Sequence, residues 1–275
     1  MAGKTHHEGP VPGIFRWISS LTLVILLAPI VVVFLAGLNS GDFLTFPPEG
    51  LSLRWIRNFF RSEAFLPAYL YSLVIALVTM LVSLVLGTAL SLFLVRSRFT
   101  GRMIMRAVLM SPIMLPGIVI GLALYLFYIS SGIGFARTQA GLVIGHVLVT
   151  CPYVIGLVSA ALVGFDRSLE EAARSLGASR WTTFRRITLP VISPSMVAGG
   201  VFAFIISFGQ FDVSLFLTPP NSTPLPIALY SSLRYTFEPT AAAAGIFAIF
   251  LVVVSMVITA KIANLRRIVS ANLTK

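Results

Sequence analysis

The chain has 275 residues, of which 57% are hydrophobic and only 11% are charged, with a mean hydropathy of +0.96. Soluble domains contain roughly 25% charged residues, so this composition argues against a soluble enzyme. A net charge of +11 would suit nucleic-acid binding, but the basic residues lie in short segments between apolar runs. We therefore expect an all-α, polytopic membrane protein and no nucleic-acid partner.

A helix that crosses the hydrocarbon core needs roughly 20 predominantly apolar residues. Six uncharged runs are long enough, and each predicts one transmembrane helix. The first is a span rather than a signal peptide, because its apolar run is longer than that of a signal peptide. The transmembrane domain is expected over 17–264, between tails at 1–16 and 265–275. The expected spans cover residues 17–38, 68–95, 105–130, 140–164, 194–217 and 240–262.

The basic residues predict the orientation, because Lys and Arg are enriched in short cytoplasmic loops. Fifteen of the 20 Lys and Arg residues fall in the two tails and in the second and fourth connections. With an even number of spans, both termini are expected in the cytoplasm. In the first connection, apolar residues alternate with Arg54, Arg57 and Arg61, which predicts an amphipathic helix at the membrane interface with Trp55 as an anchor.

Prolines and glycines interrupt two spans. Pro112, Pro116 and Gly117 lie near the start of the third, and Pro152 lies in the fourth. Backbone groups freed in lipid need partners, so such breaks indicate a bundle of helices with a path through it. Two glycine pairs four residues apart predict close helix packing. These are Gly117 with Gly121, and Gly141 with Gly145.

The fourth connection, residues 165–190, predicts two short amphipathic helices. Ser168 followed by Glu171 is a capping-box pattern, so a helix is expected to begin there. Gly177 predicts its end, and a second helix is expected over 180–187, before Pro190 opens the next span. Such a protrusion suits the docking of a partner.

This loop contains Glu171-Ala172-Ala173, Gly177, Ile187 and Leu189-Pro190. Their spacing resembles the EAA loop of permease subunits of bacterial ATP-binding-cassette (ABC) importers. Residues 144–146, 152–154 and 225–234 are similar to those of spermidine/putrescine-type permeases. The resemblance implies a type I importer permease fold with a cytoplasmic coupling loop. The implied ATPase-coupling residues are Glu171, Ala172, Ala173, Gly177, Ile187, Leu189 and Pro190.

The same resemblance implies the partners and the location. We expect a multi-pass protein of the bacterial inner membrane, paired with a second permease subunit that is a distinct homologue. A dimer of ABC ATPases would bind ATP and Mg²⁺, and a periplasmic or extracellular binding protein would deliver the substrate. The chain is expected to contact membrane lipid and to need no cofactor of its own.

Asp212 is the one ionisable residue that falls clearly within an expected span. Such residues usually face a bundle interior or a cavity, and a carboxylate there would attract a cationic amine. Gln210 and Ser214 are weaker candidates for the same path. Alternatively, Asp212 lies near the external interface, where it pairs with Arg234 or caps a helix break.

No metal-ligand spacing is present, and His146 is expected to be a hydrogen-bonded packing residue. The sequence has no phosphate-binding P-loop, so ATP hydrolysis is expected in a partner and the chain itself is expected to be non-catalytic. The expected function is import of a small cationic or zwitterionic amine such as spermidine or putrescine. Permeases for amino-acid-like amines, phosphonates or ferric ion remain alternatives.

Two other classes of protein fit less well. A secondary transporter would show inverted repeats and more charges within the membrane. An intramembrane enzyme would need a nucleophile and a base facing one cavity, whereas Cys151, His146 and Asp212 are not joined by any motif.

Overall fold

The computed structural model describes the backbone of residues 13–273 and the side chains of residues 13–261. Most of the expected tail at 1–16 and the last two residues of the tail at 265–275 lie outside this part. The described residues form helices without a β-strand, apart from one bridge between Asn39 and Leu51. The helices in chain order are α1 (Gly13–Gly37), α2 (Arg54–Arg61), α3 (Phe65–Arg96), α4 (Arg102–Met110), η1 (Ser111–Ile113), α5 (Gly117–Ser131), α6 (Gln139–Val163), α7 (Ser168–Ser175), α8 (Arg180–Thr183), η2 (Phe184–Thr188), α9 (Leu189–Phe208), α10 (Asp212–Leu217), α11 (Leu225–Tyr235) and α12 (Thr240–Leu273).

Five helical segments in the described residues are long and apolar enough to cross a membrane. They are α1, α3, α6, the continuous segment Arg180–Phe208, and α12 up to Lys261. The third expected span is a pair of helices, Arg102–Ile113 and Gly117–Ser131, bent by 105° at the prolines that the sequence marks. The six-span prediction is met when this bent pair counts as one broken span.

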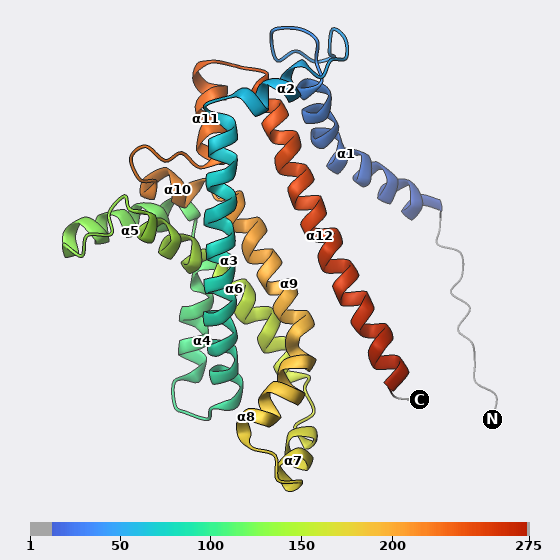
Figure 1. The fold of residues 1–275 in the computed structure, drawn as a ribbon, viewed down its shortest axis with the longest axis vertical. Helices are drawn as coiled ribbons and strands as arrows, with labels where there is room; N and C mark the ends of the chain where they lie inside the picture. Colours follow the sequence, from blue (N-terminus) through green and yellow to red (C-terminus); the bar gives the residue numbers. More distant parts are fainter. Residues whose placement is uncertain (1–12, 274–275) are drawn as a thin grey trace.

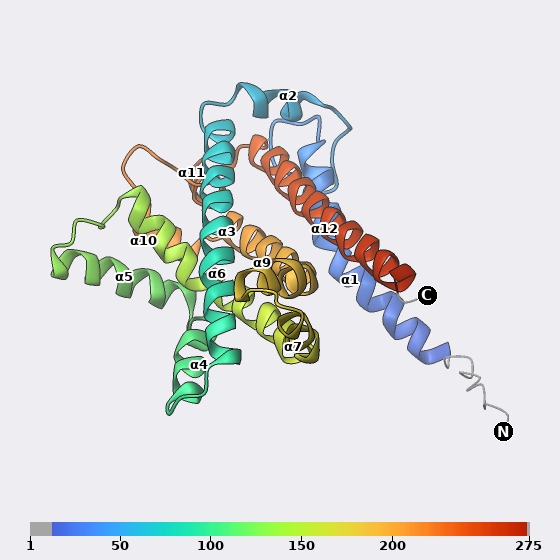
Figure 2. The ribbon, with the colours of Figure 1, turned by 60° about the horizontal axis from the view of Figure 1, so that its bottom comes forward.

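Helices α3, α6 and α9 pack together as the centre of the bundle (Figures 1 and 2). Val154 of α6 lies between Gly87 of α3 and Gly199 of α9. A Cβ atom on Gly87 would come within 2.7 Å of the Val154 side chain. The two glycines therefore let three helix backbones approach one another closely.

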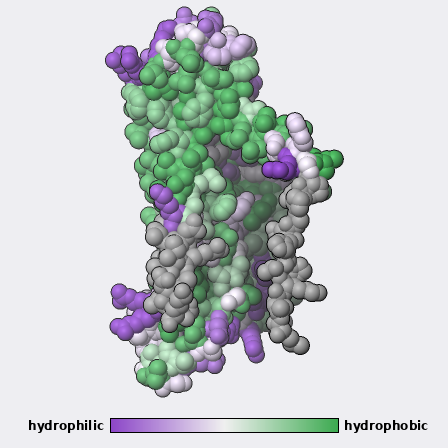
Figure 3. Space-filling view, turned by 90° about the vertical axis from the view of Figure 1, so that its right-hand side faces the viewer, coloured by the Kyte–Doolittle hydropathy of each residue, from purple (hydrophilic) through white to green (hydrophobic). Residues whose placement is uncertain are grey.

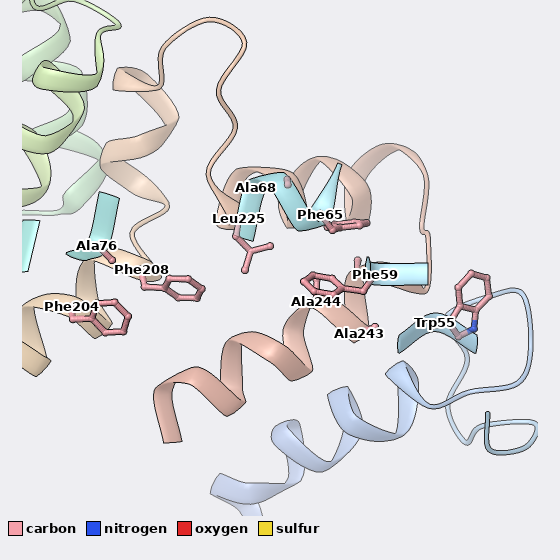
Figure 4. Packing of buried hydrophobic residues seen from close by; sticks show 12 residues of the cluster. Trp55, Phe59, Phe65, Ala68, Ala76, Phe204, Phe208, Leu225, Ala243 and Ala244 are labelled. Carbon is pink, nitrogen blue, oxygen red and sulfur yellow. The ribbon is translucent and has the colours of Figure 1, made fainter. Parts of the chain in front are cut away.

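Helices α1 and α12 form an arm along one side of this centre (Figure 1). Helix α2 lies at the top of the arm, and Phe59 on its apolar face is buried against α12 and α3 (Figure 4). Trp55 is also buried, and its indole N–H donates to the Gly41 carbonyl at 3.1 Å. The Phe59 ring stacks on Phe247 at 4.4 Å between centroids. The expected amphipathic helix is therefore present, with Trp55 and Phe59 buried in protein and Phe60 exposed.

Helix α5 projects sideways from the bundle, with α10 alongside it (Figures 1 and 2). The glycine pairs explain this contact. Gly121 of α5 faces the α10 backbone, where an added Cβ would lie 3.0 Å from the Val213 Cα, and Gly145 of α6 faces Leu217 of α10. The prediction that these glycines serve packing is confirmed.

The fifth span differs from its expected bounds of 194–217. The helix expected at 180–187 continues into α9 through a π-helical turn, Phe184–Thr188, in which the Leu189 N–H donates to the Phe184 carbonyl. A proline ring crowds the preceding turn of an α-helix, and the wider π turn makes room for Pro190 at the second position of α9. At its other end α9 stops at Phe208, and the rest of the expected span is the separate helix α10.

The molecule therefore has an α7 end, with α7 and α8, and an α11 end, with α2 and α11 (Figure 1). Figure 3 shows hydrophilic side chains gathered mainly at these two ends of one face, with hydrophobic surface between them. This distribution is that of a bundle surrounded by lipid at mid-height.

Candidate functional site

Helix α7 begins at Ser168, where the sequence predicts it, but the cap is different. The Ser168 N–H donates to the Asp166 carboxylate at 2.9 Å, and Arg167 occupies the N-cap position, where its side chain makes no hydrogen bond that caps the helix. The capping box expected from Ser168 and Glu171 is therefore wrong, because Ser168 is already the first helical residue. This hydrogen bond from Ser168 holds the pKa of the Asp166 carboxyl below its usual range.

Gly177 ends α7 in the left-handed conformation, with φ of +89°. The Gly177 N–H donates to the Arg174 carbonyl, and the Ala178 N–H donates to the Ala173 carbonyl, both at 3.0 Å. These two bonds are the Schellman motif. The four-residue spacing of Ala173 and Gly177 is thus the spacing that this helix end requires, and Gly177 acts as the predicted stop.

The predicted coupling residues lie on both helical segments of the 165–190 loop and at the start of α9. Ala173, Gly177 and Ile187 line one groove of about 340 Å³ between α7 and the α8–η2 segment. Glu171 is exposed and lines a neighbouring depression of about 590 Å³ together with Gly177 and Arg180. The remaining predicted residues are Ala172, exposed on α7, and Leu189 and Pro190 in the first turn of α9.

The acidic side chain that anchors the loop is Glu170, which the sequence analysis did not select. Its Oε1 accepts a hydrogen bond from the Arg96 guanidinium at 2.5 Å and another from the Thr188 hydroxyl. Arg96 is one of the basic residues of the second connection, which predict the orientation. The sequence signal that could have identified Glu170 is an acidic residue in a loop rich in arginine.

Asp212 begins α10 beside the first turn of α5. A Cβ atom on Gly117 would lie 2.6 Å from the Asp212 Oδ2, so the carboxylate lies against the N-terminal end of that helix. Asp212 is half-buried and forms no ion pair within the part of the chain that the structure describes. Arg234, the alternative partner, donates instead to the Tyr230 hydroxyl at 2.6 Å.

Ser214 and Gln210 lie beside the break between α9 and α10. Ser214 is fully buried, and its hydroxyl contacts the His146 Nε2 at 3.0 Å and donates to the Gln210 carbonyl. The other ring nitrogen of His146 contacts the Ser207 hydroxyl at 2.8 Å. His146 therefore bridges the two helices on either side of the break, which confirms its packing role.

A pocket of about 690 Å³ opens at the α11 end, between the start of α3, α11 and the loop before α11. Two carboxylates, Glu63 and Glu238, and two aromatic residues, Tyr71 and Tyr235, contribute to its wall. The described side chains contain no group of three or more His, Cys, Asp or Glu residues that could hold a metal ion.

Comparison with known sequences gives one family match and several relatives. The family described as binding-protein-dependent transport system inner membrane component matches residues 83–268. The putrescine transport system permease protein PotI of Escherichia coli K12 is 33% identical over 224 residues, which cover 80% of this chain and 79% of PotI. The spermidine/putrescine transport system permease protein PotC of the same organism is 30% identical over 211 residues, covering 77% and 79%.

The fold also matches solved transporters. A bacterial ABC transporter involved in the import of the polysaccharide alginate aligns with a TM-score of 0.68 at 16% identity, covering 95% of this chain and 99% of that one. The same kind of transporter, solved in complex with an alginate-bound periplasmic protein, aligns with a TM-score of 0.66 at 19% identity and covers 95% of each chain. These matches show that the chain has a permease fold.

Proposed function

The chain belongs to the family of binding-protein-dependent transport system inner membrane components, the permease subunits of ABC importers, and from this premise we propose that it forms the path for a small cationic amine such as putrescine or spermidine. The observation that carries this proposal is the similarity to two polyamine permeases over about four fifths of the chain. Its family and its several apolar helices make it a multi-pass protein of the inner membrane.

The carboxylate of Asp212 supports a cationic substrate. It is half-buried at a break in the fifth span and has no cationic partner among the described side chains. An unpaired carboxylate within a membrane protein is costly and is retained where a function requires it. An ammonium group of the substrate would supply the missing charge and a hydrogen-bond donor. Gln210, whose side chain is half-buried two residues earlier, would add a polar group to the same path.

The proposed partners follow from the family and the loop geometry. The exposed Glu171 carboxylate and the groove formed by Ala173, Gly177 and Ile187 would dock into a cleft on an ATPase dimer. This dimer would bind ATP and Mg²⁺ and hydrolyse the nucleotide, so the chain itself carries out no catalysis. A second permease subunit and a substrate-binding protein complete the complex.

The α7 end, which carries this loop, faces the cytoplasm in the proposed arrangement, together with both termini. The positive-inside distribution of basic residues supports this orientation.

Uptake by the purified complex in liposomes tests the substrate class. The complex consists of this chain with its second permease, ATPase and binding protein, and the radiolabelled solutes are putrescine, spermidine, 2-aminoethylphosphonate and ferric citrate. We expect ATP-driven uptake of the two polyamines alone. Uptake of the phosphonate or of iron, without the polyamines, would contradict the proposal.

Asp212→Asn tests the role of the carboxylate. Because a hydrogen bond to a charged group contributes about 1.5–3 kcal/mol, the variant should lower the rate of polyamine uptake by about tenfold or more. Glu49→Gln, which removes an exposed carboxylate, is the matched control and should transport normally. If uptake by Asp212→Asn equals that of the wild type, the carboxylate does not act on the path.

A further inference from the structure

One carboxylate oxygen of Glu170 joins three helical segments. The Arg96 guanidinium, at the last residue of α3, donates to Oε1 at 2.5 Å. The Thr188 hydroxyl, at the last residue of the π turn before α9, donates to the same oxygen. The guanidinium also lies 3.4 Å from the Thr188 hydroxyl. Helix α7 is thereby attached directly to two of the three helices at the centre of the bundle.

The environment of this ion pair makes it stronger than a surface pair. The side chains of Arg96 and Glu170 are 34% and 17% exposed, and Thr188 is fully buried. The other ion pair among the described residues, Arg54 with Asp42, is 53% and 68% exposed. Exposed pairs contribute little because water and salt screen them, whereas a partly buried pair with a second donor is screened less.

A second contact attaches the same side of α7 to α3. Arg167, at the N-cap position of α7, donates from Nη2 to the Val95 carbonyl at 3.3 Å. Arg167 and Glu170 are three residues apart, so they share one face of the helix. The last carbonyls of α3 lack partners within that helix, and the Arg167 guanidinium satisfies one of them.

Two apolar side chains at α7 are exposed, which leaves them free to contact a partner. Leu169 on α7 and Leu176, the residue that directly follows this helix, are 49% and 90% exposed. Non-helical residues connect α7 to α6 and to α8. Without side-chain contacts to the bundle, α7 would be able to move relative to α3 and α9 when a bound partner moves.

We propose that Arg96, Glu170 and Thr188 form a clamp that transmits movement of α7 to α3 and α9 during ATP-driven transport. Glu170 is a positioning residue in this scheme, since it touches neither substrate nor nucleotide. The clamp makes α7, the end of α3 and the start of α9 move as one rigid unit, so that closure of the ATPase changes the packing of the spans. The clamp rests on the proposed function as an importer permease.

The test measures polyamine molecules transported per ATP hydrolysed by the full complex in liposomes. Glu170→Gln and Arg96→Gln each remove one charge, and Arg96→Glu combined with Glu170→Arg restores the pair in reverse. We expect each single variant to lower this ratio about fivefold or more, while ATP hydrolysis continues, and the reversed pair to recover much of the loss. Asp42→Asn, which breaks the exposed pair, should leave the ratio unchanged.

The outcomes separate the clamp from the proposed function. Absence of ATP-driven uptake by the wild-type complex would overturn the proposed function and the clamp with it. A wild-type ratio in Glu170→Gln, or equal losses in the single variants and the reversed pair, would overturn the clamp alone. If the charge variants do not reach the membrane, Thr188→Val decides, because it keeps both charges and removes one donor. An unchanged ratio in that variant would overturn the clamp.

Discussion

Gly177 illustrates how a single residue determines the shape of the candidate coupling loop. Its φ of +89° lies in the left-handed region, and a Cβ atom there would meet no atom within 4 Å. The cost of Gly177→Ala is therefore one of backbone conformation alone, about 1–2 kcal/mol. We expect the variant to fray the end of α7, which faster hydrogen exchange of residues 168–180 would reveal, and to lower transport.

Gly156→Ala is the matched control for this substitution. Gly156 lies within α6, and its backbone is not in the left-handed conformation. An added Cβ atom there would likewise meet no atom within 4 Å. Alanine is favoured over glycine in a helix by about 1 kcal/mol, so this variant should be as stable as the wild type or more so. Unchanged exchange in Gly177→Ala would show that the Schellman turn does not depend on glycine.

The contrast between Glu170 and Glu171 shows what sequence can predict at the residue scale. The spacing of the motif singles out Glu171, and the structure leaves that side chain exposed. Glu170 is its neighbour and is fastened to Arg96 of α3, 74 residues earlier in the chain. A contact across that separation has no local signal, so sequence alone did not distinguish the anchoring carboxylate from the exposed one.

At the scale of elements, His146 stabilises the break between α9 and α10. Its ring nitrogens contact Ser207 on one side of the break and Ser214 on the other, and the imidazole is buried. His146→Ala would leave two buried hydroxyls with one partner fewer and would open a cavity. We expect a loss of about 2 kcal/mol or more in the free energy of unfolding, measured by thermal or chemical denaturation in detergent.

Thr79→Val gives the opposite expectation in the same bundle. Thr79 of α3 is fully buried, and its hydroxyl has no hydrogen-bond partner among the described residues. Valine has nearly the same shape and removes an unsatisfied polar group, so this variant should be neutral or stabilising. If His146→Ala is as stable as Thr79→Val, the histidine does not hold the two helices together.

The helices themselves were largely predictable, because uncharged apolar runs of this length form spans, and the prolines before Gly117 mark the bend of the third span. The end of α9 at Phe208 was not predictable from hydropathy, because residues 209–217 are still largely apolar in spite of Gln210, Asp212 and Ser214. It depends on α10 packing against Gly121 and Gly145 of other helices. The π turn before Pro190 makes room for the proline ring, but no hydrophobic periodicity indicates it.

At the scale of the whole molecule, the proposed role of the 165–190 loop is to dock onto an ATPase and to move the spans. Its most direct test is cross-linking from Leu176, the residue that directly follows α7 and is 90% exposed. In a Cys151→Ala background, Leu176→Cys is expressed with the rest of the transporter in its native membrane and labelled with a short cross-linker that reacts with the thiol at one end and is photoactivated at the other. Leu51→Cys, an exposed position near α2, is the control.

We predict that Leu176→Cys forms a covalent product with a protein carrying a P-loop, that adding ATP changes the yield, and that Leu51→Cys does not form this product. Adding Glu171→Arg to Leu176→Cys should lower the yield, since the exposed carboxylate belongs to the proposed docking surface. Failure of Leu176→Cys to link to any ATPase, in a complex that still transports polyamine, would contradict the account.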